Sequence, residues 1–368
     1  MVPEIVDVLL LGLCYACTLT SSCLLTMVGP LAASHLGASD RIAPFAVGTF
    51  RVGIAVGSLL SAPLFDHLAR RNGFLVGCFL TVISSALGII AILLGLQAFV
   101  FVATFIAGIA QGLGQLYRFA AMEVCAPEDK PFAVTLVLSG GIISAFAGPE
   151  LASRTVMAFG SSQMYLCPFL LLGAVGLLNS LLVVLVRFPA QKASSSLLPT
   201  KDGSVAAPAT ALWQLMLRPT PMIAVAIAAL ANAMMVMLLS PLVIAMLNAG
   251  FSTQSITWTL EAHFFARFAP GLVSGKLIGL IGPLRMMLIG LVAYCGTVAS
   301  LLNCADDGQL ISWVVGMAAC GLAWNLCYAS GTVMIASSYE AQDAYGGPQR
   351  FHHLLIIWNR IIVQRAGL

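Results

Sequence analysis

The twelve residues from Ala62 to Gly73 read APLFDHLARRNG and decide the fold of this chain. The segment is one of the few places where charges cluster, and it lies between two long apolar runs. Asp66 ends the first run, and Arg70 and Arg71 follow within five residues. A short basic loop between two apolar runs is typical of a connection between membrane helices on the cytoplasmic side. The segment therefore predicts a membrane protein and the side on which this loop lies.

Composition also places the chain in a lipid bilayer. Of the 368 residues, 60% are hydrophobic and 8% are charged, and the mean hydropathy is +0.99. A soluble chain of this length needs far more charged surface to stay dissolved. The net charge of +3 offers no basic field for nucleic acid, so we expect no nucleic-acid partner.

The polar residues show no pattern of an enzyme. Most of the ten cysteines lie inside apolar runs, where cysteine behaves as a small hydrophobic residue. Cys14 and Cys17 are three residues apart, but they lie within a predicted membrane helix and we interpret them in the same way. We read no nucleophile beside a base, no phosphate-binding loop and no metal cluster. The sequence therefore predicts no enzyme activity, no metal site and no cofactor.

Ten apolar runs are long enough to cross a bilayer, which takes about 20 residues per helix. They cover residues 8–33, 43–65, 73–96, 98–117, 131–152, 164–186, 221–247, 256–281, 284–303 and 309–336. If the N-terminus is cytoplasmic, thirteen Lys and Arg residues fall on the inner side and two on the outer side. We therefore predict an all-α, polytopic bundle of about ten transmembrane helices with a cytoplasmic N-terminus.

One loop is much longer than the others and suggests how the chain is divided. Residues 188–218 are rich in Ala, Ser, Pro and Lys, a composition typical of a flexible linker. We predict an N-terminal six-helix half (1–187), a cytoplasmic linker (188–218), a partial C-terminal half of four helices (219–336) and a cytoplasmic tail (337–368). Arg51 and Arg267, in the second and eighth runs, suggest an approximate internal repeat.

This organisation resembles the major facilitator superfamily of transporters, in a two-half architecture. The loop after the second run is similar to the family's Gly-x-Leu-x-Asp-Arg-x-Gly-Arg-Arg segment, with its key charges at Asp66, Arg70 and Arg71. The chain departs from that pattern at Ala62, His67 and Ala69. The resemblance covers about residues 5–340 and implies secondary active transport of a small organic solute by alternating access.

Other segments are similar to a subgroup of bacterial-type permeases. They are Gln111-Gly112-Leu113-Gly114, Gly140-Gly141, Gly148-Pro149-Glu150 and His263-Phe264-Phe265-Ala266-Arg267-Phe268-Ala269-Pro270. The subgroup includes proteins associated with vitamin uptake, so the resemblance makes riboflavin a candidate substrate. It also implies a plasma membrane or a bacterial inner membrane as the location.

The chain differs from the proton-coupled drug exporters of the same superfamily. Gly108 stands where those exporters carry an arginine, and Ser144, Ala152 and Ser153 stand where they carry further glycines. These departures argue against a drug/proton antiporter.

Two arginines lie within predicted spans. An arginine at the centre of a membrane costs about 2.5–3.5 kcal/mol on insertion scales, so we expect Arg51 and Arg267 to face the bundle interior. There they could attract an anionic or hydrogen-bond-accepting substrate, or pair with Glu261. A fixed ion pair or a side chain that reaches the interface is the structural alternative.

The eighth run also holds the candidates for proton coupling, Glu261 and His263. His263 and Arg267 are four residues apart and share a helix face, which could form one wall of a cavity. Histidine changes charge near neutral pH, so H⁺ coupling is possible in principle. The alternative is a hydrogen-bonded histidine with a structural role.

Further polar residues could line the same cavity. Gln111 and Gln115 could donate hydrogen bonds to a heteroaromatic substrate, and Trp324 and Asn325 could supply a stacking face and a donor. Helix packing and interhelical hydrogen bonds are the alternative for all four.

Charges at the cytoplasmic ends suggest a gate. We predict gate roles for Asp66, Arg70, Arg71, Arg118 and Glu123, with a salt bridge between Arg118 and Glu123 as the simplest interpretation. Helix-breaking residues in the fifth run suggest a weak hinge formed by Gly140, Gly141, Gly148 and Pro149.

Full-length relatives have twelve helices, whereas ten can be read in this sequence. No run within residues 337–368 is long enough to span a bilayer. A second hypothesis is therefore a truncated, non-transporting membrane protein, or a regulatory partner of an intact permease. We favour the transporter.

Overall fold

A computed structural model describes residues 2–126, 129–156, 158–160, 163–188, 219–307 and 309–340. All regular structure in these ranges is helical. Most of the predicted linker, from residue 189 to 218, and most of the predicted tail, from residue 341, lie outside the described residues. The domain division stays a prediction.

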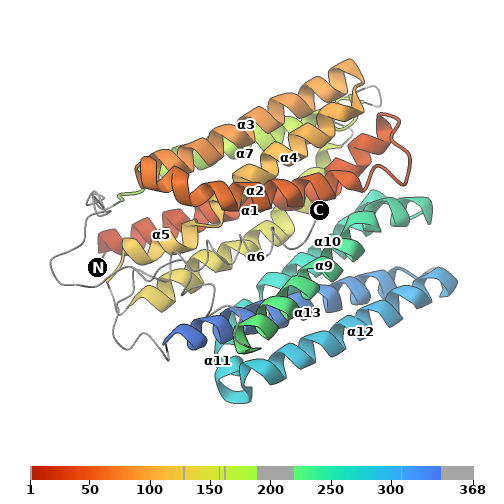
Figure 1. Cartoon of the computed structure of the whole chain (residues 1–368). Helices are drawn as coiled ribbons and strands as arrows, with labels where there is room; N and C mark the ends of the chain where they lie inside the picture. The colour runs from red at the N-terminus through yellow and green to blue at the C-terminus, as the bar shows by residue number, and fades with distance from the viewer. Residues whose placement is uncertain are drawn as a thin grey trace.

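The helices form two side-by-side groups (Figure 1). The first group holds α1 (Val2–His35), α2 (Phe45–His67), α3 (Arg70–Leu94), α4 (Gln97–Gly114), α5 (Tyr117–Glu123), α6 (Lys130–Thr155) and α7 (Leu166–Leu185). The second group holds α9 (Pro219–Asn248), α10 (Thr253–Phe268), α11 (Gly271–Ile281), α12 (Pro283–Asp307) and α13 (Leu310–Glu340). We call the end that holds the start of α1 and the α2–α3 loop the inner end, and the opposite end the outer end.

The expected membrane spans are confirmed. Nine helices of the described residues are long and apolar enough to cross a membrane, and the pair α10 and α11 provides a tenth if it counts as one span. That pair covers the predicted run 256–281, but it bends by 46° between its two helices. Pro270 lies in the break and has no N–H to continue the helical hydrogen bonds.

Small residues let α2 and α4 approach each other at backbone distance. A Cβ atom added to Gly53 or to Gly108 would collide with a carbonyl oxygen of the other helix, that of Phe105 or of Phe50. Glycine at both positions therefore allows the close approach, as is common for helices packed in a bilayer. This contact fixes the face that α2 turns to the bundle interior.

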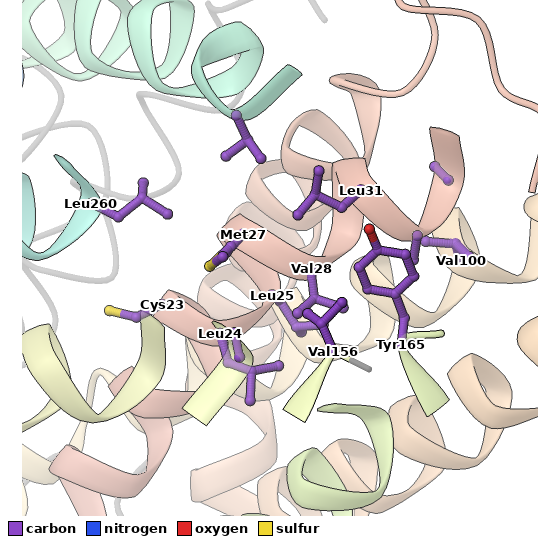
Figure 2. Close-up of a cluster of buried hydrophobic side chains, with 14 of the residues drawn as sticks. Cys23, Leu24, Leu25, Met27, Val28, Leu31, Val100, Val156, Tyr165 and Leu260 are labelled. Carbon is purple, nitrogen blue, oxygen red and sulfur yellow. The ribbon is translucent and has the colours of Figure 1, made fainter. Parts of the chain in front are cut away.

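The two groups meet most closely at the outer end. One apolar cluster joins the last turns of α1 and α9 with the first turns of α10, and Figure 2 shows part of it around α1, with Leu260 on one side and Tyr165 on the other. Asn248 at the end of α9 donates a hydrogen bond of 2.8 Å to Asp40 in the α1–α2 loop. The outer end is therefore closed by packed side chains from both groups.

The inner end is organised differently. A second apolar cluster there is built almost entirely within the first group, around Phe74 and Tyr117, whose rings stack 4.2 Å apart. In the part of the chain that the structure describes, the hydrogen bonds and ion pairs of the first group's inner end join helices of that same group.

Candidate functional site

Arg51 and Arg267 bring charge from both groups into the bundle interior. Arg51 lies on α2, Arg267 lies near the end of α10, and their charges are close enough to interact. The Nε atom of each is buried without a hydrogen-bond partner among the described residues. The expectation that both arginines turn inward agrees with this geometry.

Aromatic rings surround the Arg267 guanidinium. The Cζ atom of Arg267 lies 4.0 Å from the centre of the Trp324 ring and 5.3 Å from the centre of the Phe268 ring. Such contacts attract a cation to the negative face of the ring, but they leave its net charge uncompensated. The aromatic contacts therefore orient Arg267 and do not neutralise it.

Glu261 does not pair with either arginine. Its carboxylate is half-buried and lies close enough to Glu150 of α6 for the two negative charges to repel. Glu150 itself forms an ion pair with Arg154, one turn further along α6, with an Nε–Oε1 distance of 2.6 Å. The pairing of an interior arginine with Glu261, one of the alternatives that the sequence left open, is not found among the described side chains.

His263 is fully buried between α10 and α13. Its Nδ1 atom lies 3.0 Å from the carbonyl oxygen of Met317, and because a carbonyl only accepts, Nδ1 carries the proton. The carbonyl of His263 lies against Gly321 of α13, which has no Cβ to block the approach. The Nδ1 contact agrees with the structural alternative, and the cavity wall shared with Arg267 stays a prediction. Proton coupling by Glu261 or His263 stays a prediction.

Trp324 and Asn325 are engaged by their own neighbours. The Trp324 ring stacks on Tyr328 at 4.5 Å, and its Nε1 donates a hydrogen bond of 3.3 Å to Asn232. Asn325 donates a hydrogen bond of 2.8 Å to the carbonyl of Arg267, next to the break after α10. One N–H of the Asn325 amide thus supports the backbone at Arg267, and the role of Asn325 as a donor to a ligand ring stays a prediction.

Gln111 lies in α4 and Gln115 at its C-terminal cap, where Tyr15 of α1 contacts Gln115. Gln111 is buried, and its Oε1 has no partner among the described residues, whereas Gln115 accepts a long hydrogen bond of 3.5 Å from the Tyr15 hydroxyl. Tyr15 also lies within electrostatic reach of Arg118 and Arg267. Sequence reasoning missed Tyr15, because a tyrosine inside an apolar run gives no signal of its own.

The predicted gate charges make contacts within the first group. Arg70 holds Glu123 with two hydrogen bonds, of 3.0 Å and 2.6 Å, and Arg71 donates to the carbonyl of Val186 at 3.0 Å. The predicted Arg118–Glu123 bridge is wrong: Arg118 lies over the Phe119 ring at 4.8 Å, and its Nε is buried without a partner. The side chain of Asp66 lies outside what the structure describes.

The predicted hinge residues all lie in α6 at close contacts. A Cβ on Gly140 would lie 2.5 Å from a carbonyl oxygen of α1, and one on Gly141 would lie 2.7 Å from the Phe268 ring. Gly148 faces Cys23 of α1 at similarly close range, and Pro149 follows it inside the helix. Close packing explains these glycines, and their role as a hinge stays a prediction.

No group of three His, Cys, Asp or Glu side chains suited to a metal ion occurs in the described ranges. The polar atoms of the interior are instead guanidinium, amide and hydroxyl groups, which form hydrogen bonds with organic ligands.

Comparison with known proteins identifies the family. Residues 11–347 match the Major Facilitator Superfamily. The chain is 25% identical over 345 residues to the riboflavin transporter RfnT of Brucella anthropi, which covers 92% of this chain and 82% of that protein. It is 24% identical over 319 residues to the uncharacterized MFS-type transporter YddS of Bacillus subtilis, with 84% and 72% covered.

The fold is also similar to a solved transporter. The crystal structure of a D-xylose–proton symporter aligns with a TM-score of 0.58 and 16% identity, over 99% of this chain and 96% of that one. At this identity the likeness concerns the fold alone. Because the family match extends over almost the whole sequence, this chain belongs to the major facilitator superfamily of membrane transporters and is an integral plasma-membrane protein.

Proposed function

We propose that this chain is a secondary active transporter that carries a small organic solute by alternating access through a site between its two helix groups. One observation carries the proposal: polar side chains of both groups meet inside a bundle whose outer end is sealed by apolar packing. Substrate sites of secondary transporters lie where their repeats meet, and gating of one repeat against the other exposes them to each side in turn. An interior site that is sealed toward one side suits that cycle.

Riboflavin is the first solute to test. The relative from Brucella anthropi is named a riboflavin transporter, and the interior of this chain offers amide side chains that could bind a heteroaromatic ring, Gln111 and Gln115. A proton gradient is the driving force to test with it.

The experiment is uptake of labelled riboflavin and a panel of small organic solutes into proteoliposomes, with and without an inward proton gradient. Arg267→Gln removes a charge from the interior, whereas Lys276→Gln removes one from the exposed surface of α11. We expect saturable uptake by the native chain, its loss in Arg267→Gln and its retention in Lys276→Gln.

Two results would count against the proposal. Uptake that stays linear with concentration for every solute, in folded protein, would contradict carrier function for this panel. Equal loss in both variants would mean that net charge, and not the interior site, explains the effect.

A further inference from the structure

Three arginines of the bundle interior have no acidic partner among the side chains that the structure describes. Arg51, Arg118 and Arg267 each have a buried Nε without a hydrogen-bond partner, and no ion pair joins any of them to a described carboxylate. The carboxylates nearest in the fold are already engaged or turned away. Glu123 binds Arg70, Glu150 binds Arg154, and Glu261 faces Glu150.

Two of these charges also repel each other across the interface between the groups. Arg51 belongs to the first group and Arg267 to the second, and Arg51 lies within electrostatic reach of the Arg267 charge. Like charges in a low-dielectric interior destabilise the protein strongly, and a buried charge persists where a counter-charge compensates it. The side chains that approach them, Cys23 and Tyr15, are neutral at physiological pH and leave the positive charge in place.

We infer that the solute is an organic anion, whose negative group lies between Arg51 of α2 and Arg267 of α10. This inference rests on the proposed function and names the chemical class of its substrate. The Trp324 ring contacts the Arg267 guanidinium and the Asn325 amide binds the Arg267 backbone carbonyl, so the side chain is oriented before the anion arrives. Bidentate pairing with a carboxylate or phosphate is the contact to which a guanidinium is best suited.

The remaining arginine extends the positive field toward the inner end. Arg118 is the second residue of α5, and like Arg267 it acts on the Tyr15 hydroxyl of α1. A path lined by one sign of charge raises the local concentration of the opposite ion. Arg118 would therefore add to the positive field that an anion meets when it approaches Arg51 and Arg267 from the inner end.

Trp324 provides a probe that needs no knowledge of the natural solute. Iodide is a small anion that quenches tryptophan fluorescence on contact, caesium is the matching cation, and acrylamide is a neutral quencher. The full-length chain is measured in detergent at constant ionic strength, and subtraction of Trp324→Phe isolates the emission of Trp324. We expect this emission to be quenched by iodide and hardly at all by caesium.

Variants that remove one arginine charge test whether the arginines attract the iodide. In Arg51→Gln and in Arg267→Gln we expect the iodide quenching constant of Trp324 to fall by about tenfold, the lower end of the range for counter-ion enrichment in charged clefts. Acrylamide quenching should stay unchanged, which shows that exposure of the ring is the same. Arg267→Lys keeps the charge and should keep the iodide effect. Iodide quenching that is equal in native protein and both Gln variants, or matched by caesium, overturns the inference.

A second arm separates this inference from the proposed function. Uptake of riboflavin is compared with that of riboflavin 5′-phosphate, which carries the same ring and a phosphate group. Preference for the phosphate ester that disappears in Arg51→Gln supports the anion site. Saturable uptake of neutral riboflavin without any iodide effect leaves the transporter standing and overturns the anion site. An iodide effect without uptake of any solute supports the anion site and contradicts carrier function for the solutes used.

Discussion

The polar residues of α10 illustrate how neighbours on one helix take different surroundings. His263 packs against α13, Glu261 faces α6, and Arg267 reaches the interface with α2. Residues two positions apart on a helix point in different directions, and residues four positions apart lie on one face. The neighbouring helices then decide which groups each side chain contacts. Of the three, Arg267 alone combines an unpaired charge with contacts that fix its orientation.

Removal of the His263 ring should affect stability more than transport chemistry. We expect His263→Ala to lower the free energy of unfolding by about 1–3 kcal/mol, because the Met317 carbonyl would lose its donor in a buried place. His263→Asn keeps a donor and should lose less. Thermal unfolding in detergent measures both, and His67→Ala, at the exposed end of α2, is the control.

The pH profile of uptake tests whether His263 has a structural role or takes part in proton coupling. If His263 only holds α10 to α13, the folded fraction of each variant keeps the native pH profile. A flattened profile in His263→Asn with native stability would show that the ring takes part in proton coupling.

Among whole elements, the contact of α2 with α4 determines where Arg51 points. The helices touch through backbone at Gly53 and Gly108, so their rotation about their own axes is fixed by steric contact. The bent pair α10 and α11 determines the position of Arg267. Because the helix breaks at Pro270, the backbone carbonyl of Arg267 accepts its hydrogen bond from Asn325. Both arginines are thus placed by helix geometry and not by a local salt bridge.

A methyl group at this contact should separate the two helices. We expect Gly108→Ala to lower the free energy of unfolding by about 1–3 kcal/mol, because the new Cβ would collide with the Phe50 carbonyl. Gly48→Ala, in α2 at a place with open space, should be neutral or stabilising by up to about 1 kcal/mol. The yield of monodisperse protein and its melting temperature measure the difference. Equal melting temperatures would show that α2 and α4 are not held this closely.

At the scale of the whole molecule, the two ends of the bundle differ in how the groups meet. The outer end combines the shared apolar cluster with the Asp40–Asn248 hydrogen bond, whereas the polar contacts described at the inner end of the first group stay within that group. The Arg70–Glu123 ion pair therefore links α3 to α5 within the first group and does not connect the two groups. Opening of the outer end would require the apolar cluster to separate.

A covalent link across the outer end should stop transport. We expect a short thiol-reactive cross-linker in Asp40→Cys/Asn248→Cys to reduce uptake to about a tenth or less, because a carrier that cannot open one side cannot complete alternating access. Cleavage of the linker should restore uptake. The two variants that carry only one of these substitutions, treated in the same way, control for reaction at native cysteines. Full uptake by cross-linked protein would contradict opening between these residues.

The sequence by itself determined the membrane class, the spans and the family resemblance. These properties depend on local composition: each span must be long and apolar enough for the bilayer, and the loop after the second span carries its charges in one short segment. It also identified Arg51 and Arg267 as interior residues, because a charge inside a span has few favourable places to go. The helix break after α10 could be anticipated only in part, from Pro270.

Only the tertiary structure decided which polar groups meet. Sequence reasoning paired Arg118 with Glu123 and left a pairing of the interior arginines with Glu261 open, whereas in the fold Glu123 binds Arg70 and Glu261 lies within electrostatic reach of Glu150. It also brought Tyr15 to the arginines. Partners of this kind depend on helix rotation and on distances between helices far apart in sequence, and close packing of small residues sets both.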